Sequence, residues 1–453
     1  MTPEALDGAY GFGRSKLRIM IHLLKAQWFF IFGRTLGKWR RYRAAVSQLE
    51  RGLALKPKDL SALCLLGWCY FHLHEYKSAF ESFDRALQVS PGNAYARLNI
   101  GESLASLGRY EEAAESISRA LRMESKYGES ARHLKLLGLT YAQLGRNQEA
   151  CENLRKADQV CPGDAETMYW LGRILNSFER YEEAERYLRK AAALEPDNFH
   201  DHGDLGLALY ALEKWTESAA EYEQAIRLQP DWVDGYISLG KALRQLKDYT
   251  RSIYAIEQAV NLQPDNPDHY LQLGVSYGEA GRWEEKLEAD RKLVQLRPDD
   301  AMSYLALSAS YHALEQYQES ADACREALKI NPGCVPALEG MGYAYLNLNR
   351  FEDAADALRH AISITSDTPY THAWLAHAYA GMNNEKAARE EISALVKLDA
   401  AMAKEIEPLV EDKLRASLPN IELGSENKFV QTASAPVQVA GSASLEAHLH
   451  IVP

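Results

Sequence analysis

The chain has 453 residues, of which 47% are apolar and 25% are charged. These proportions are typical of folded proteins and exclude a fibrous or a generally disordered chain. Residues 1–60 contain 12 Lys or Arg and 4 Asp or Glu, which gives this segment a net charge of +8 and leaves −20 on the remainder. We expect no nucleic acid as a ligand, because phosphate binding requires a basic surface and most of this chain is acidic.

The N-terminal part of the chain is basic and amphipathic. Between residues 16 and 33 the large apolar side chains recur at spacings of three and four, which predicts a helix with one apolar face. We expect a basic amphipathic segment over residues 1–25. Residues 14–43 are expected to cap the fold that follows, to dock on an anionic membrane surface, or to bind a partner protein. The side chains expected to make a membrane or partner contact are Trp28, Arg34, Lys38, Arg40, Arg41 and Arg43.

This segment is not expected to cross a membrane. Its uninterrupted apolar run, residues 28–32, is far shorter than the roughly 20 residues that a spanning helix needs. The small-residue cleavage site of a secretory signal does not follow it. We therefore expect a cytoplasmic protein, either in solution or peripheral on the cytoplasmic face of the membrane.

A unit of about 34 residues repeats along most of the chain. In residues 60–93 its framework positions are Leu66, Gly67, Tyr70, Ala79, Phe83, Ala86 and Pro91. This spacing resembles the tetratricopeptide repeat, in which small residues let two helices approach closely and the proline ends the second helix. The pattern recurs in phase over 26–59, 60–93, 94–130, 131–164, 165–198, 199–232, 233–266, 267–300, 301–334, 335–368 and 369–402.

The resemblance implies an all-α fold, a right-handed α-solenoid superhelix of stacked antiparallel helix pairs. Nine of the eleven repeats have glycine at the helix-crossing position. Each such glycine costs about 1 kcal/mol relative to alanine, and close packing between helices is the expected compensation. After a solenoid over residues 26–402, we expect a capping helix over 403–421 and a disordered tail over 422–453.

The sequence offers no room for a catalytic domain, because the segments outside the repeats are too short to build one. We expect no enzyme activity, no cofactor, no bound metal and no small-molecule substrate. The six cysteines are expected to be reduced thiols in the core, because they include no Cys-x-x-Cys pair. The histidines expected on the surface without a metal are His200, His202, His372 and His377, and a metal is likewise not expected at His448 and His450.

The family resemblance also implies a concave groove, lined by positions 2, 5, 9 and 12 of the first helices, that receives an extended peptide or a partner helix. Carried onto this chain, the groove positions singled out are Trp68, Phe71, Arg132, Lys135, Tyr169, Arg173, Asn176, Lys241 and Arg244. The cations among them are expected to hold the carboxylates of an acidic or C-terminal peptide. Ion pairs on the helix surface are the alternative. Lys135 has Leu139 where chaperone-binding members of the family have an asparagine, so the resemblance does not extend to their clamp.

These features together predict a non-catalytic scaffold that binds a peptide or partner helix in the groove of a tetratricopeptide superhelix. Two alternatives remain open. The first is a peripheral membrane adaptor that docks through residues 14–43, and the second is a regulatory or assembly subunit of an enzyme complex.

Overall fold

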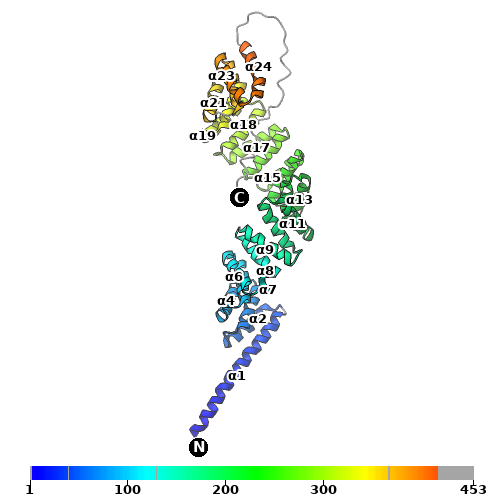
Figure 1. The fold of residues 1–453 in the computed structure, drawn as a ribbon, viewed down its shortest axis with the longest axis vertical. Helices are drawn as coiled ribbons and strands as arrows, with labels where there is room; N and C mark the ends of the chain where they lie inside the picture. Colours follow the sequence, from blue (N-terminus) through cyan, green and yellow to red (C-terminus); the bar gives the residue numbers. More distant parts are fainter. Residues whose placement is uncertain (1–2, 39, 129, 366–367, 417–453) are drawn as a thin grey trace. The chain divides into compact units, whose positions relative to one another are not determined.

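A computed structural model of the chain describes residues 3–38, 40–128, 130–365 and 368–416. The regular secondary structure in these residues is entirely α-helical (Figure 1). The helices form two compact units, Met1–Pro230 and Asp231–Pro453, which we call unit 1 and unit 2.

Unit 1 contains six helix pairs and one short extra helix among its described residues. Its helices are α1 (Pro3–Lys38), α2 (Tyr42–Leu55), α3 (Leu60–His72), α4 (Tyr76–Val89), α5 (Ala94–Ser106), α6 (Tyr110–Met123), α7 (Ser125–Gly128), α8 (Ala131–Gln143), α9 (Asn147–Val160), α10 (Ala165–Ser177), α11 (Tyr181–Leu194), α12 (Phe199–Ala211) and α13 (Trp215–Leu228). The short helix α7 occupies the three-residue insertion of the third repeat.

Unit 2 contains five helix pairs and a final helix among its described residues. Its helices are α14 (Val233–Gln245), α15 (Tyr249–Leu262), α16 (Pro267–Glu279), α17 (Trp283–Leu296), α18 (Ala301–Ala313), α19 (Tyr317–Ile330), α20 (Val335–Asn347), α21 (Phe351–Ile364), α22 (Pro369–Gly381), α23 (Glu385–Leu398) and α24 (Ala400–Ala416).

The same local signals begin and end the helices in successive pairs. Asp59 caps α3, because its carboxylate accepts a hydrogen bond from the amide of Ala62 at 3.0 Å. The turn that leads to the second helix contains a residue in the left-handed conformation, for example His74 with φ +60° and Gly108 with φ +74°. The proline that follows the second helix, for example Pro91, then prevents its continuation.

The two helices of a pair approach closely where the repeated sequence pattern places glycine. At Gly172 an added Cβ would lie 2.4 Å from Leu188 Cγ, which is too close for two carbon atoms. Leu188 is fully buried by this contact, so the missing side chain of α10 makes room for a large apolar side chain of α11. Burying a leucine contributes about 2 kcal/mol, which offsets the cost of a glycine inside a helix.

Within each unit, each pair also packs on the next pair, so each unit has a core that runs along its stacked helices. In unit 1 the largest apolar cluster extends from Leu36 of α1 to Leu137 of α8. In unit 2 the final helix α24 packs on both α22 and α23 through Val410 and Leu414. The predicted α-solenoid of stacked helix pairs is confirmed.

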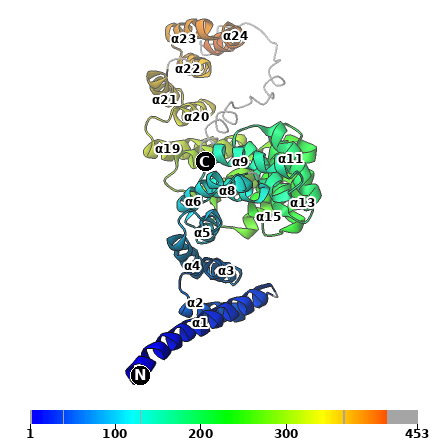
Figure 2. The same cartoon turned by 60° about the horizontal axis from the view of Figure 1, so that its bottom comes forward.

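Helix α1 differs from the other helices in length. Its C-terminal part packs on α2, whereas its N-terminal part extends past that partner (Figures 1 and 2). Ala26 and Leu36 are buried against the fold, and Gly33 lies so close to α2 that an added Cβ would be 2.8 Å from Leu49 Cγ. Among the described helices, none combines the length and the apolar character needed to cross a bilayer.

Candidate functional site

The first helices of neighbouring pairs contact each other and form a surface within each unit. We call it the first-helix surface. In unit 1 it includes α8, α10 and α12, and in unit 2 it includes α18, α20 and α22. Every side chain predicted to line a groove lies on a first helix, and only Lys241 and Arg244 belong to unit 2.

Trp68 and Phe71 are half-buried on α3 and pack on aromatic rings of their own unit. The Trp68 ring lies edge-on to Tyr42 at 5.4 Å and to His72 at 4.3 Å. The Phe71 ring lies 5.4 Å from that of Tyr76. Burial lowers the pKa of His72, so its imidazole is uncharged at neutral pH. The part of the first-helix surface on α3 is therefore aromatic.

Arg132 and Lys135 on α8 form ion pairs within unit 1. Arg132 lies 3.0 Å from Glu102, and Lys135 lies 3.1 Å from Asp164 and 2.9 Å from Glu166. Burial lowers the pKa of Lys135, but its hydrogen bonds to the two carboxylates outweigh burial and raise it. These contacts are the ion pairs that the sequence left open as the alternative. A peptide carboxylate at Lys135 would have to displace them.

Tyr169 and Arg173 lie together on α10, facing α12. Arg173 donates a hydrogen bond to the Tyr169 hydroxyl at 3.2 Å, and its guanidinium lies 5.3 Å from the centre of the Trp170 ring. Burial raises the pKa of Asp204 on α12, and the charge of Arg173 opposes that shift. Burial also raises the pKa of Tyr169 to about 12. Arg173 is exposed and forms no ion pair with a described residue. It is therefore better placed than Lys135 to donate hydrogen bonds to a partner's carboxylate.

A hollow of about 350 Å³ opens between α10 and the preceding helices α8 and α9. It is lined by Ala142, Gln143, Asn147, Trp170, Arg173, Ile174 and Ser177. This lining combines the ring of Trp170 and the cation of Arg173 with uncharged polar side chains. A side chain of a bound segment that carries both apolar and anionic groups would fit this lining.

Two predicted groove residues need correction. Asn176 is only 8% exposed and donates a hydrogen bond to the backbone oxygen of Asp204 at 3.0 Å. Arg244 is only 6% exposed, donates to the Gln272 side chain at 3.3 Å, and lies 3.5 Å from Glu279. Both side chains connect neighbouring first helices rather than face a partner. Lys241, on the same helix as Arg244, is half-buried.

Sequence reasoning missed a row of aromatic rings on the first-helix surface of unit 2. We call it the aromatic row. It consists of Tyr370 and Trp374 on α22, Tyr343 on α20 and His312 on α18. Consecutive ring centroids are 6.0, 5.0 and 4.8 Å apart. Burial lowers the pKa of His312, so the row carries no positive charge at neutral pH.

The spacing of the aromatic row explains why the sequence search missed it. Residues 312, 343 and 374 are 31 residues apart, three fewer than the repeat period. Each ring therefore lies almost one helical turn earlier on its helix than the ring of the preceding repeat. A search at fixed repeat positions compares residues that are 34 apart. It does not group residues that are 31 apart, such as those of the aromatic row.

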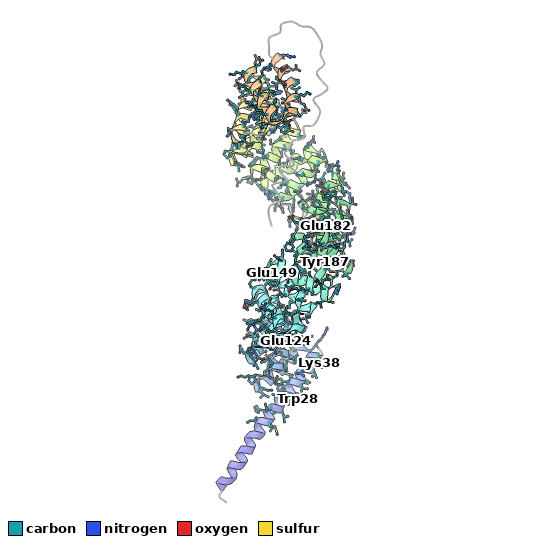
Figure 3. The ribbon with its side chains drawn as sticks, in the orientation of Figure 1. Trp28, Lys38, Glu124, Glu149, Glu182 and Tyr187 are labelled. Atoms are coloured by element: carbon teal, nitrogen blue, oxygen red, sulfur yellow. The ribbon has the colours of Figure 1, made fainter. Side chains whose placement is uncertain are left out.

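The residues predicted for membrane or partner contact lie at the N-terminal end of unit 1 (Figure 3 labels Trp28 and Lys38). Trp28, Arg34 and Lys38 are exposed on α1. Arg40, in the turn after α1, is also exposed. The same holds for Arg41 and Arg43. None of these five cations forms an ion pair with a described residue.

Two expectations about single residues are wrong. His372 is buried rather than on the surface, and its Nδ1 lies 2.6 Å from a carboxylate oxygen of Glu391. Cys161 is exposed, whereas the other cysteines are buried or half-buried. His448 and His450 lie outside the described residues. Within the described residues, no group of His, Cys, Asp and Glu is arranged to hold a metal ion.

Comparison with protein families agrees with the repeat pattern. Tetratricopeptide repeat models match residues 98–157, 204–267 and 271–334, residues 311–373, and residues 165–198. Together these matches cover more than half of the sequence. The chain belongs to the tetratricopeptide repeat family. A further model, described as anaphase-promoting complex, cyclosome, subunit 3, matches residues 38–120 of this tetratricopeptide repeat protein.

Three solved structures illustrate what this tetratricopeptide repeat protein is similar to. YrrB, a "TPR protein with an unusual peptide-binding site", is 21% identical over 43% of this chain and 98% of its own, with a TM-score of 0.39. Yeast Tom70 is 15% identical over 86% of this chain and 96% of its own, with a TM-score of 0.36. The APC/C hetero-tetramer Cut9-Hcn1 is 13% identical over 87% of this chain and 96% of its own, with a TM-score of 0.39. No curated protein matches the sequence. The family repeats support a role as a protein-interaction scaffold.

Proposed function

We propose that this protein is a non-catalytic scaffold that binds a protein or peptide partner on its first-helix surface. The observation that carries the proposal is the aromatic row of unit 2. Tyr370 is 44% exposed, and Trp374, Tyr343 and His312 are only half-buried although they lie beside one another. Aromatic side chains at protein interfaces supply large contact areas at low entropic cost and dominate binding energies.

The row suggests the chemistry of the bound segment. Its rings are neutral, and the nearby carboxylate of Glu339 is engaged by the hydroxyl of Thr371. A segment with apolar or proline side chains would pack on the rings, and its backbone carbonyls could accept hydrogen bonds from the tyrosine hydroxyls. An extended segment suits a row that crosses three consecutive first helices.

Substitution of the row tests this proposal. Tyr343→Leu combined with Trp374→Leu removes both rings but keeps apolar volume against the core. We expect the partner captured by the intact chain from its native host to be lost. The matched control is Tyr254→Leu, because Tyr254 is 64% exposed on the second helix α15. Equal capture by all three proteins would contradict the proposal.

A preference for an acidic or C-terminal peptide is a finer part of the proposal and rests on Arg173. Its exposed guanidinium, beside Trp170 and Tyr169, can donate charge-assisted hydrogen bonds to a carboxylate. Arg173→Gln keeps the side chain polar and should weaken binding of such a peptide by about tenfold, since a hydrogen bond to a charged group contributes roughly 1.5 kcal/mol. Unchanged peptide affinity would remove the carboxylate preference and leave the scaffold role standing.

A second candidate function, the peripheral membrane adaptor, is favoured by one observation. Within residues 19–38, several large apolar side chains of α1 are exposed, among them Leu24 at 59% and Trp28 at 58%. In this function the repeats recruit a protein while α1 docks on a bilayer. Flotation with liposomes separates the two candidates, because a chain without residues 1–25 should remain unbound if α1 is the docking element.

A further inference from the structure

The outward face of α1 carries a stripe of large apolar side chains. Met20, Leu24, Trp28 and Ile31 follow each other at spacings of four, four and three, which places them along one line of the helix. All four are between 52% and 60% exposed. We call them the α1 stripe. The ring of Trp28 also stacks on that of Phe32 at 5.3 Å, which widens the apolar surface.

The α1 stripe is separate from the face that holds α1 to the repeats. Ala26 and Leu36 are buried, Phe30 packs close to Gly52 of α2, and Gly33 packs on Leu49. These residues lie on the opposite side of the helix from Leu24 at 100° per residue. The stripe is therefore available for a partner without any change in the packing of α1 on α2.

Positive charges border the stripe on both sides. At 100° per residue, Lys25 lies about 100° to one side of Leu24 and Arg34 lies about 80° to the other side. Residues 14–43 contain nine Lys or Arg and no Asp or Glu. The described and exposed members of this set, Lys25, Arg34, Lys38, Arg40, Arg41 and Arg43, form no ion pair within the described part of the chain.

This charge pattern selects among the possible occupants. A second copy of α1 would bring nine further cations next to the first nine, and like charges at such distances repel. No helix among the described residues is both long and apolar enough to cross a membrane. An anionic bilayer satisfies both features, because acyl chains take up the apolar side chains and lipid phosphates surround the flanking cations. Tryptophan is also favoured at the boundary between headgroups and acyl chains.

We propose that α1 binds the surface of an anionic phospholipid bilayer, lying in its plane with the α1 stripe among the acyl chains. This proposal rests on the second candidate function and specifies its lipid and its contact residues. Lys25 and Arg34 contact lipid phosphates from the two borders of the stripe, and Lys38 does so from its C-terminal end. Because the opposite face of the same helix is packed on α2, the first repeats are held in a fixed orientation to the membrane.

Flotation of the full chain with vesicles tests the proposal. We expect binding to vesicles of equal parts phosphatidylserine and phosphatidylcholine, and no binding to phosphatidylcholine alone. Leu24→Glu should abolish binding. Its matched control, Leu194→Glu, should retain it, because Leu194 is 53% exposed on α11, away from α1. Arg34→Gln should weaken binding about fivefold, because a cation near an anionic surface contributes about that factor.

A depth measurement distinguishes lipid insertion from simple charge attraction. Bromine-labelled acyl chains should quench a part of the tryptophan fluorescence that is absent from the Trp28→Phe variant. Equal quenching of both proteins, binding that survives Leu24→Glu, or no binding to either vesicle would overturn the proposal. Loss of a protein partner rather than vesicle binding on Leu24→Glu would also overturn it and assign the stripe to that protein. Partner capture through the aromatic row is measured with other residues, so the scaffold role is tested independently.

Discussion

Lys286 Nζ lies 2.5 Å from Asp290 Oδ2 inside unit 2, where the corresponding pairs of other repeats have uncharged side chains. Asp290 is 1% exposed and faces Gly274, just as Leu188 faces Gly172 in an earlier repeat. Ser310 of α18 donates a second hydrogen bond to the same carboxylate. One repeat of unit 2 therefore has a charged interior.

This buried pair predicts opposite effects for a single and a double substitution. Lys286→Met alone leaves the Asp290 carboxylate buried without its cation and should destabilise unit 2 by about 3–5 kcal/mol. Lys286→Met combined with Asp290→Leu replaces the buried ion pair with apolar side chains of similar volume and should be neutral or stabilising by about 1–4 kcal/mol. Urea unfolding of the three proteins checks both. A double variant less stable than Lys286→Met would show that the pair is needed for the fold.

The helix crossings predict a sharp difference between two glycine substitutions. Gly172→Ala places a methyl group against Leu188 and should destabilise the fold by about 1–3 kcal/mol through overpacking. Gly92→Ala is the control, because no atom lies within 4 Å of its added Cβ. Thermal unfolding of both variants checks the difference, and equal losses would contradict the crossing geometry.

Asp201 predicts a pH dependence of stability. It is 1% exposed on α12, and burial, followed by repulsion from Glu195, raises its pKa to about 6. The neighbouring Asp204 adds to the repulsion, whereas His202 opposes the shift. Because the pKa is raised on folding, the folded state binds the proton more tightly. Its contribution to stability is complete below about pH 4 and is lost as the pH rises through about 6.

Asp201→Asn removes this ionisation. The variant should be more stable than the original chain at pH 8 by up to about 3 kcal/mol, and the difference should vanish near pH 4. Urea unfolding at a series of pH values measures it. Asp197→Asn is the control, because Asp197 is exposed two residues before α12 begins. A constant difference between Asp201→Asn and the original chain at all pH values would exclude the titration.

The fold could be predicted from the sequence because its signals are local. The proline after most second helices, the Asp or Asn cap before many first helices, and the glycine at most crossings recur with a period of about 34 residues. Each signal acts within one pair or on the next, so no long-range information was needed. The family and the stacked helix pairs were accordingly predicted correctly.

The side-chain partners of the candidate site could not be predicted in the same way. Lys135 was expected to face a peptide, but Asp164, which caps α10, and Glu166 of α10 lie within 3.1 Å of it. The position of a residue in the repeat identifies the face of the helix on which its side chain lies. It does not identify the neighbouring carboxylate with which that side chain pairs. Asn176 and Arg244 were misjudged for the same reason, since their burial depends on the adjacent first helix.

Photo-crosslinking from the aromatic row tests the scaffold role most directly. A photoreactive phenylalanine analogue replaces Tyr343 on the first helix α20 in one protein and Tyr254 on the second helix α15 in another. We predict that the partner crosslinks from position 343 and not from position 254, and that a proline-rich or apolar peptide competes with it. Crosslinking from position 254 alone would contradict binding on the first-helix surface.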